Sequence, residues 1–434
     1  MIRGLVAGCS AMVLLLRLIP SEVAAAEWPP RDGLRVVFLG DSITQAGLYV
    51  RYVDAYLLAR FPDRRVEVIG LGLASETVSG NTEPGHPYPR PDIRTRLARA
   101  LKLTKPDLVF VCYGMNDGLY TPPDPARTEL YRKGIEAVVD SVKQAGAEVI
   151  VGTPPPFDSR PIRAKTAPLS APVFGYQHPY VDYDGVLGIY TNALLDFNDK
   201  RRTVADIHGA TRDALTALRV NDPTFTFATD GIHPGADGHW LIARSFLEAW
   251  GAAATPEVDA AAIDAKNRAV IRGNVELVAS PEGDNSFRLR WTTKIPLPRD
   301  PGWDARVVAL ERIDERFNRH RLLIVGLPDP RYAIYENDQN VGEVTREQLA
   351  DGLDLLRFPR LSTNRRSAEV WSMVQQKHNI LRPSWLEAVG HGPPLFGKTL
   401  PIDAAKAKAA PIEEKIRDLT RPAPVSLRLV PIAG

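Results

Sequence analysis

A serine, an aspartate and a histidine stand at spacings that suit nucleophilic catalysis. Ser42 lies in the segment Gly40-Asp41-Ser42, just after an apolar run, where a hydroxyl that opens a helix has backbone N–H groups beside it. Asp230 precedes His233 by three residues, so its carboxylate can accept a hydrogen bond from Nδ1 and leave Nε2 as a general base. Each segment alone also fits an ordinary turn or helix cap. Only their combination predicts a site.

Two further segments can supply hydrogen-bond donors to an oxyanion. Asn116 follows the clearest strand-like run of the chain, and a carboxamide at the carboxyl end of a strand can donate into a site. Gly72 follows a second strand-like run, where a glycine lets the backbone approach closely and offers an N–H. Asn116 with Asp117 also fits a plain turn.

Short apolar runs must position these four segments. Residues 34–39, 66–70, 107–113 and 148–151 are predicted strands, with a fifth at 204–206, and helical patterns such as 93–103 and 127–145 separate them. Alternating strands and helices predict a parallel sheet with helices on both faces. Because sites in such sheets lie at the carboxyl ends of the strands, all four segments are expected at one edge.

The set resembles the SGNH/GDSL hydrolase family, whose signature residues are Ser, Gly, Asn and His in that chain order. Here they are Ser42, Gly72, Asn116 and His233, with Asp230 at the family's D-x-x-H position. The resemblance covers residues 34–250 and implies a three-layer α/β/α, flavodoxin-like parallel sheet. It implies a catalytic triad of Ser42, Asp230 and His233, and an oxyanion hole of Ser42 N–H, Gly72 N–H and the Asn116 side chain.

The match has two departures. Ile43 stands where the family often has leucine, and Gly70 stands where an asparagine commonly precedes the family's glycine, which weakens the assignment of Gly72 most. An α/β-hydrolase is excluded because no G-x-S-x-G elbow follows a strand. The expected mechanism is acyl transfer through an acyl-Ser42 intermediate, with no metal and no organic cofactor.

The N-terminus and the bulk composition limit where the protein works. Residues 1–26 combine Arg3, an apolar stretch and three alanines, which predicts a secretory signal cut near Ala26 and a secreted or periplasmic, bacterial protein. No later run is long enough for an integral membrane anchor.

With 54 Lys and Arg against 52 Asp and Glu, no nucleic-acid partner is expected. Cys112 would be the remaining cysteine, so neither a disulfide nor a cysteine metal site is predicted, and the scattered histidines suggest no metal.

Composition divides the mature chain into a hydrolase domain at residues 34–253 and a β-rich accessory region with helices at 254–434. The accessory region shows no catalytic pattern. Its predicted strands are residues 274–279, 286–292, 322–326 and 332–335, and its predicted helices are residues 368–377 and 404–419. The Pro-rich residues 153–183 fit either a segment that overhangs the site or a surface insertion. Basic residues between positions 90 and 102 fit a solvated helix face, or a rim for anionic glycans; they are Arg90, Arg94, Arg96, Arg99 and Lys102.

The predicted function is therefore a secreted serine esterase that hydrolyses O-acyl esters. Export and the lack of a long apolar, lid-like segment favour a polar substrate such as an acetylated glycan. Alternatives within the same machinery are a lipase, a lysophospholipase, a thioesterase or an acyl transferase. A non-catalytic glycan-binding protein that keeps the fold is the alternative outside enzymes, and protein partners are unknown.

Overall fold

The computed structural model of the chain describes residues 28–196, 202–252, 259–318, 320–390, 397 and 399–432. The predicted signal segment and its cleavage position near Ala26 lie outside these residues. In the described part, no helix combines the length and the apolar character needed to cross a membrane.

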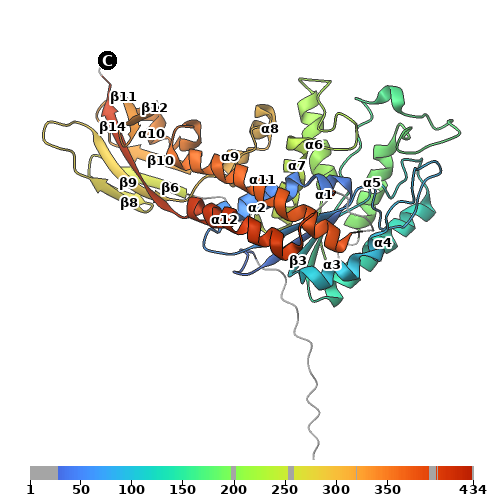
Figure 1. The fold of residues 1–434 in the computed structure, drawn as a ribbon. Helices are drawn as coiled ribbons and strands as arrows, with labels where there is room; N and C mark the ends of the chain where they lie inside the picture. Colours follow the sequence, from blue (N-terminus) through green and yellow to red (C-terminus); the bar gives the residue numbers. More distant parts are fainter. Residues whose placement is uncertain are drawn as a thin grey trace, which may run out of the picture.

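A parallel five-stranded sheet forms the first half of the molecule (Figure 1), in the order β2-β1-β3-β4-β5. This order and the helices on both faces confirm the predicted α/β/α, flavodoxin-like fold. The strands are β1 (Arg35–Gly40), β2 (Glu67–Gly72), β3 (Leu108–Cys112), β4 (Glu148–Gly152) and β5 (Thr203–Ala205).

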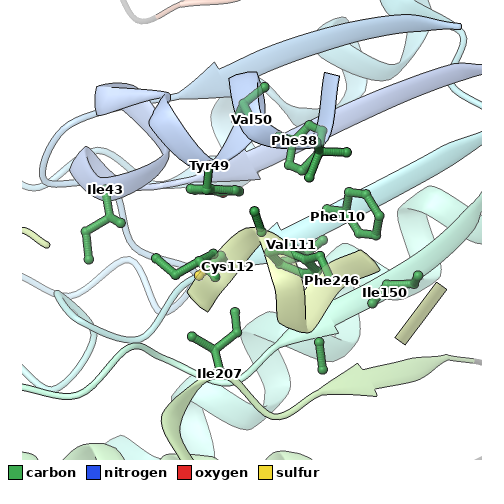
Figure 2. Packing of buried hydrophobic residues seen from close by; sticks show 14 of the residues in the cluster. Phe38, Ile43, Tyr49, Val50, Phe110, Val111, Cys112, Ile150, Ile207 and Phe246 are labelled. Carbon is green, nitrogen blue, oxygen red and sulfur yellow. The ribbon is translucent and has the colours of Figure 1, made fainter. Parts of the chain in front are cut away.

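Apolar runs in the sequence become buried strands because both faces of the sheet are covered. Every residue of β3 is buried, and Phe38 of β1 lies 4.8 Å from Phe110 of β3 between ring centroids. Phe246, from a helix on one face, lies 4.6 Å from Phe110 (Figure 2). This packing fixes the carboxyl ends of the central strands, from which the loops of the site start.

Right-handed connections place the helices on both faces of this sheet. On one face α2 (Leu48–Arg60) packs against α7 (Ala236–Trp250), which also contacts α6 (Ile207–Arg219). On the other face α4 (Pro125–Gln144) lies between α3 (Leu97–Thr104) and α5 (Tyr183–Leu195). The five-residue helix α1 (Ser42–Ala46) follows β1 directly and leads into α2.

The second half is β-rich, as predicted, and its described residues form two sheets. The four-stranded sheet has the order β13-β10-β6-β7, and its strands are β6 (Asp259–Asp264), β7 (Ala269–Arg272), β10 (His320–Val325) and β13 (Leu353–Asp354). The five-stranded sheet has the order β12-β11-β14-β9-β8, and its strands are β8 (Val275–Val278), β9 (Phe287–Thr293), β11 (Arg331–Glu336), β12 (Gln339–Thr345) and β14 (Ala423–Pro431). The last strand in the sequence, β14, is thus the central strand of its sheet, paired with β9 and β11.

Four helices of the second half pack onto the first half, and they are α8 (Ala305–Leu310), α9 (Ile313–Phe317), α11 (Ser362–Val389) and α12 (Ile402–Thr420). The short helix α10 (Arg346–Ala350) packs instead against β10 and β12 of the accessory sheets. The long helix α11 runs beside α2 and the edge strand β2, with α12 alongside it (Figure 1). Trp371 and Val374 of α11, and Val307 of α8, belong to the same buried cluster as the core of the parallel sheet. One hydrophobic core therefore extends across the predicted boundary at residues 253/254.

Candidate active site

Ser42 is the first residue of α1, at the carboxyl end of β1, which lies between β2 and β3 in the sheet. The carboxylate of Asp41 caps this helix by accepting a hydrogen bond from Ile43 N–H at 2.9 Å. Gly40 makes the tight turn possible, because a Cβ at that position would lie 1.9 Å from Thr44 Oγ1. Strand, glycine and cap together fix where the serine hydroxyl emerges.

The structure brings Ser42, His233 and Asp230 into one hydrogen-bonded line. Ser42 Oγ lies 2.8 Å from His233 Nε2, and His233 Nδ1 lies 2.7 Å from Asp230 Oδ2. The other carboxylate oxygen, Asp230 Oδ1, accepts hydrogen bonds from Ile232 N–H and His233 N–H. The Asp-x-x-His turn thus orients the imidazole through both its backbone and its side chain. The side chains of His233 and Asp230 are 46% and 54% exposed, so this line opens to solvent.

Asp230 and His233 shift each other's pKa values in opposite directions. Burial acts to raise the pKa of Asp230, but hydrogen bonds from the side chain and the N–H of His233 outweigh it, so the pKa is lowered. The hydrogen bond to Asp230 raises the pKa of His233 above its usual value. A carboxylate beside the imidazole stabilises the imidazolium that forms when the histidine takes a proton.

Asn116 has its carboxamide fixed from both ends. Tyr120 Oη donates to Asn116 Oδ1 at 3.1 Å, and Asn116 Nδ2 donates to Glu76 O at 3.2 Å. The tyrosine therefore determines which end of the amide carries the donors. One Nδ2 hydrogen remains for another acceptor. The residue follows β3, the strand next to β1, and only 4% of it is exposed.

Gly72 lies inside β2 and packs against the nucleophile helix. A Cβ there would lie 2.1 Å from Gln45 N, so only glycine fits. Leu73 N–H donates to Gly40 O of β1. Since successive N–H groups of a strand point to opposite sides, the Gly72 N–H points away from β1, toward the outer edge of the sheet. This direction is unfavourable for a donor to a group on Ser42.

Ser75, three residues later, is a candidate oxyanion donor that the sequence does not predict. It has the left-handed φ of 62°, which is uncommon for a serine. Ala74 N–H, next to it, donates to Gln45 Oε1 of α1 at 2.5 Å, which ties this loop to the nucleophile helix. Among the described residues, the Ser75 N–H has no hydrogen-bond acceptor. The positive φ is a conformational signal that the serine itself does not reveal.

Buried charges hold the loop between β2 and α3. Arg96 pairs with Glu76 at 2.6 Å, with side chains 1% and 0% exposed, and Tyr113 Oη donates to the same carboxylate. Asp117 accepts hydrogen bonds from two N–H groups of this loop, at residues 78 and 79, and burial raises its pKa to about 6.

The interpretation of the basic residues at positions 90–102 as a solvated face is wrong for Arg90 and Arg96, whose guanidinium groups are buried in ion pairs. It holds for the exposed Arg94, Arg99 and Lys102.

The Pro-rich segment at residues 153–183 borders the site on two sides. Asp158 N–H donates to Gly231 O, next to the triad aspartate, at 2.9 Å. Tyr180 N–H donates to Tyr120 O at 2.8 Å, and Tyr176 N–H donates to Glu83 at 3.4 Å. Of the two alternatives left open by the sequence, the structure favours a wall of the site over a remote surface insertion.

Within the described ranges, no group of three or more His, Cys, Asp or Glu side chains is arranged to hold an ion. Cys112 is buried, and burial raises its pKa well above the ordinary value, as expected for a small core residue.

Comparison with known proteins agrees with this geometry. Residues 38–241 match the GDSL-like Lipase/Acylhydrolase family. An acetylxylan esterase of Geobacillus stearothermophilus is 23% identical over 238 residues, which cover 51% of this chain and 95% of that protein. The solved structure of a gut microbial diltiazem-metabolizing enzyme superposes with a TM-score of 0.73 at 17% identity, covering 94% of this chain and all of that one. This likeness shows that the two proteins share a fold, and that the shared fold includes both halves of this chain.

The family match includes the segments around Ser42, Asn116 and His233, and the structure gives the order of strands that the family resemblance implied. The chain is an ester-hydrolysing enzyme whose residues 38–241 form a domain of the SGNH/GDSL hydrolase family.

Proposed function

We propose that this protein is an exported serine esterase that removes O-acyl groups, chiefly acetyl groups, from a carbohydrate. The observation that carries the serine chemistry is the hydrogen-bonded line from Ser42 Oγ through His233 to Asp230. The acetylated carbohydrate is suggested by the acetylxylan esterase similarity and by the open site. The signal-like residues 1–26 support export.

Acylation begins when Ser42 Oγ attacks the ester carbonyl carbon and His233 Nε2 takes the hydroxyl proton. The carbonyl oxygen becomes an oxyanion, and the imidazolium is stabilised by Asp230. The tetrahedral intermediate collapses, the C–O bond to the sugar breaks, and His233 returns the proton to the leaving sugar oxygen. Water then repeats the sequence on acyl-Ser42 and releases the carboxylic acid.

Three N–H donors are proposed to hold the oxyanion. Ser42 N–H and Asn116 Nδ2 retain the roles implied by the family resemblance. For the third donor we favour Ser75 N–H over Gly72 N–H, because the former has no acceptor among the described residues and the latter points to the outer sheet edge. Donors fixed in advance by the buried loop contacts cost no reorganisation during the reaction.

The exposure of the triad favours a polar, bulky substrate. His233 and Asp230 are about half exposed, and the excursion that borders them does not enclose them. A long acyl chain needs an extended apolar surface to leave water, whereas an acetyl group needs little. An acetyl ester on a large alcohol therefore fits this site better than a lipid.

The decisive experiment compares the full chain with its Ser42→Ala variant on p-nitrophenyl acetate, after expression in a bacterial host. Loss of the nucleophile should lower kcat at least about 10³-fold. The activity is expected in the periplasm or the medium. Ser141→Ala, on the remote helix α4, is the matched control and should retain full activity. Equal rates for Ser42→Ala and the parent enzyme would refute the proposed nucleophile.

A further inference from the structure

Exposed aromatic rings are rare in this chain and occur together. Among the described tyrosine, phenylalanine and tryptophan side chains, only Tyr88 and Tyr176 are exposed, at 50% and 36%. Both lie in loops that border the active site, one after β2 and the other in the Pro-rich excursion. Since aromatic rings contribute much apolar area, two exposed rings at one rim call for a functional explanation.

His86 joins the two tyrosines into one surface. Its ring lies 4.7 Å from Tyr88 and 5.3 Å from Tyr176 between centroids, at interplanar angles of 87° and 61°. His86 Nδ1 lies 2.5 Å from Tyr88 O, which fixes the imidazole on its own loop. We call Tyr88, His86 and Tyr176 the aromatic platform.

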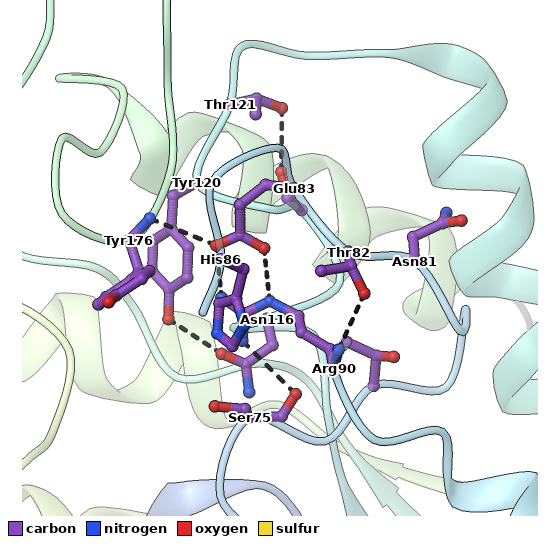
Figure 3. A network of polar contacts seen from close by, with 12 residues as sticks. Ser75, Asn81, Thr82, Glu83, His86, Arg90, Asn116, Tyr120, Thr121 and Tyr176 are labelled. Atoms are coloured by element: carbon purple, nitrogen blue, oxygen red, sulfur yellow. Dashed lines mark hydrogen bonds and ion pairs between the residues drawn. The ribbon is translucent and has the colours of Figure 1, made fainter. Parts of the chain in front are cut away.

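A buried ion pair holds the two loops of the aromatic platform together (Figure 3). Glu83 and Arg90 form a bidentate pair at 2.6 and 2.7 Å, with side chains 1% and 2% exposed. Glu83 Oε1 also accepts the Tyr176 N–H, so the carboxylate bridges from one loop to the other. Bidentate guanidinium–carboxylate pairs have a fixed geometry. The rings are therefore presented on a rigid base, although they face solvent.

The aromatic platform is also connected to the reacting end of the site. Ser75 Oγ lies 3.2 Å from Tyr88 Oη, and Arg90 Nη1 donates to Ser75 O at 3.5 Å. Arg90 lies over the ring of Tyr120, the residue that orients Asn116, at 5.6 Å (Figure 3). A group bound on the platform would thus lie beside the loop that carries the proposed oxyanion donor.

We propose that the aromatic platform is a sugar subsite that stacks a pyranose ring of the alcohol part of the substrate. A pyranose has flat faces of C–H groups and polar edges, which match tyrosine rings with hydroxyls at their rims. Tyr88 and Tyr176 already direct their hydroxyls to Ser75 and Gln177, at 3.2 and 2.9 Å. Rigid rings lose little conformational entropy on binding, so a fixed platform favours recognition of such a ligand. This inference rests on the proposed function, since it requires a glycan ester as substrate.

The test compares Tyr88→Ala and Tyr176→Ala with the parent enzyme on two esters, acetylated xylo-oligosaccharide and p-nitrophenyl acetate. For each variant, the ratio of kcat/KM for the oligosaccharide to kcat/KM for the small ester should fall about 10-fold, mainly through KM, as expected for one lost stacking contact. Tyr88→Phe and Tyr176→Phe keep the rings and should retain most of the ratio. Tyr335→Ala, on β11 in the accessory region, is the control and should leave both activities unchanged.

The outcomes separate the two proposals. If the parent enzyme deacetylates the oligosaccharide and the alanine variants keep the parent ratio, the aromatic platform is not a sugar subsite while the esterase proposal stands. If the parent enzyme hydrolyses p-nitrophenyl acetate but no acetylated oligosaccharide, the glycan substrate and the platform are both overturned. If the phenylalanine variants lose the ratio as fully as the alanine variants, the hydroxyl contacts and not ring stacking determine specificity, and the stacking proposal fails.

Discussion

At the residue scale, the protonation of His233 is set by two carboxylates. The hydrogen bond that the imidazole donates to Asp230 raises the pKa of His233 most, and the negative charge of Asp41 adds to this effect. Burial raises the pKa of Asp41 itself to about 7, so its charge changes near neutral pH. The base of the proposed triad must be neutral to accept the serine proton, and its raised pKa therefore sets the acid limit of activity.

This relation predicts the pH profile. Activity should be lost as the pH falls through the raised pKa of His233, so the acid limb of kcat/KM should lie above the usual value of about 6.5. Asp230→Asn removes the partner that raises this pKa, so the limb should shift to lower pH while kcat falls about 10³- to 10⁴-fold. A pH series on p-nitrophenyl acetate measures both effects. An unchanged limb in Asp230→Asn would show that the aspartate does not control the imidazole.

Most residues of the candidate site could be predicted from the sequence, because Ser42 and Asn116 follow strands and the Asp230/His233 pair comes just before a helix. The oxyanion loop could not. Gly72 is predicted as a donor because it follows a strand-like run, but whether its N–H faces the site depends on strand register and on which edge of the sheet is free. The proposed role of Ser75 depends on a left-handed backbone conformation that tertiary contacts impose, and the residue type does not predict this conformation.

At the element scale, a helix of the second half holds the nucleophile helix. Arg382 of α11 donates to the carbonyl oxygens of Gln45 and Ala46, at the carboxyl end of α1. Nearby, Asp54 of α2 pairs with Lys377 and His378 of α11, at 2.5 and 2.8 Å. A cation at a helix C-terminus satisfies orphan carbonyls and complements the helix dipole. Helix α11 therefore contributes to the position of Ser42 without contacting the substrate.

We expect Arg382→Ala to lower kcat about 10-fold with little change in KM, because a small displacement of α1 misaligns Ser42 but not the substrate subsites. Arg382→Lys should restore part of kcat, since it keeps the positive charge but loses the guanidinium geometry. Steady-state kinetics on p-nitrophenyl acetate, with thermal unfolding as a check of the fold, provide the measurement. A loss confined to thermal stability would contradict this positioning role.

The length of α11 could not be predicted from its sequence pattern alone. The sequence predicts a helix at residues 368–377, whereas the observed helix runs from Ser362 to Val389. Pro383 interrupts the pattern, and a proline is normally a sign that a helix has ended. Here contacts on both sides of the proline, from His378 to Asp54 and from Trp385 in the shared core, maintain the helix past it. Strand β14 escaped prediction for a similar reason, because Pro424 and Pro431 lie in its run.

At the scale of the whole molecule, the two predicted domains share a core. Trp371, Val374 and Trp385 of α11 lie in the buried cluster that contains the aromatic residues of β1 and β3. The buried pairs of Asp54 with α11 and of Arg60 with Asn318 add polar contacts across the same boundary. The division at residues 253/254 therefore describes composition and chain order better than independent stability.

A chain that ends at residue 253 should accordingly fold poorly. Without α11 and α8 it would expose the apolar surface that they cover, and Asp54 would be left buried without its cationic partner Lys377, which costs about 3–5 kcal/mol for a broken buried pair. Circular dichroism, size-exclusion chromatography and esterase assays of residues 28–253 against the full chain test this. A monomeric, cooperatively unfolding and fully active fragment would establish the first half as an autonomous domain.

The central position of β14 bears on when the protein can become active. Strand β14 lies between β9 and β11 and pairs with both. The five-stranded accessory sheet therefore cannot form completely before residues 423–431 have left the ribosome. Until then, two unpaired strand edges remain open to association with other chains. Helix α11, which supports Ser42, lies between β11 and β14 in the sequence, so the nucleophile is not fully positioned before residues 362–389 have been synthesised. Such late completion agrees with the proposed export, in which a polypeptide crosses a membrane unfolded and acquires activity only at its destination.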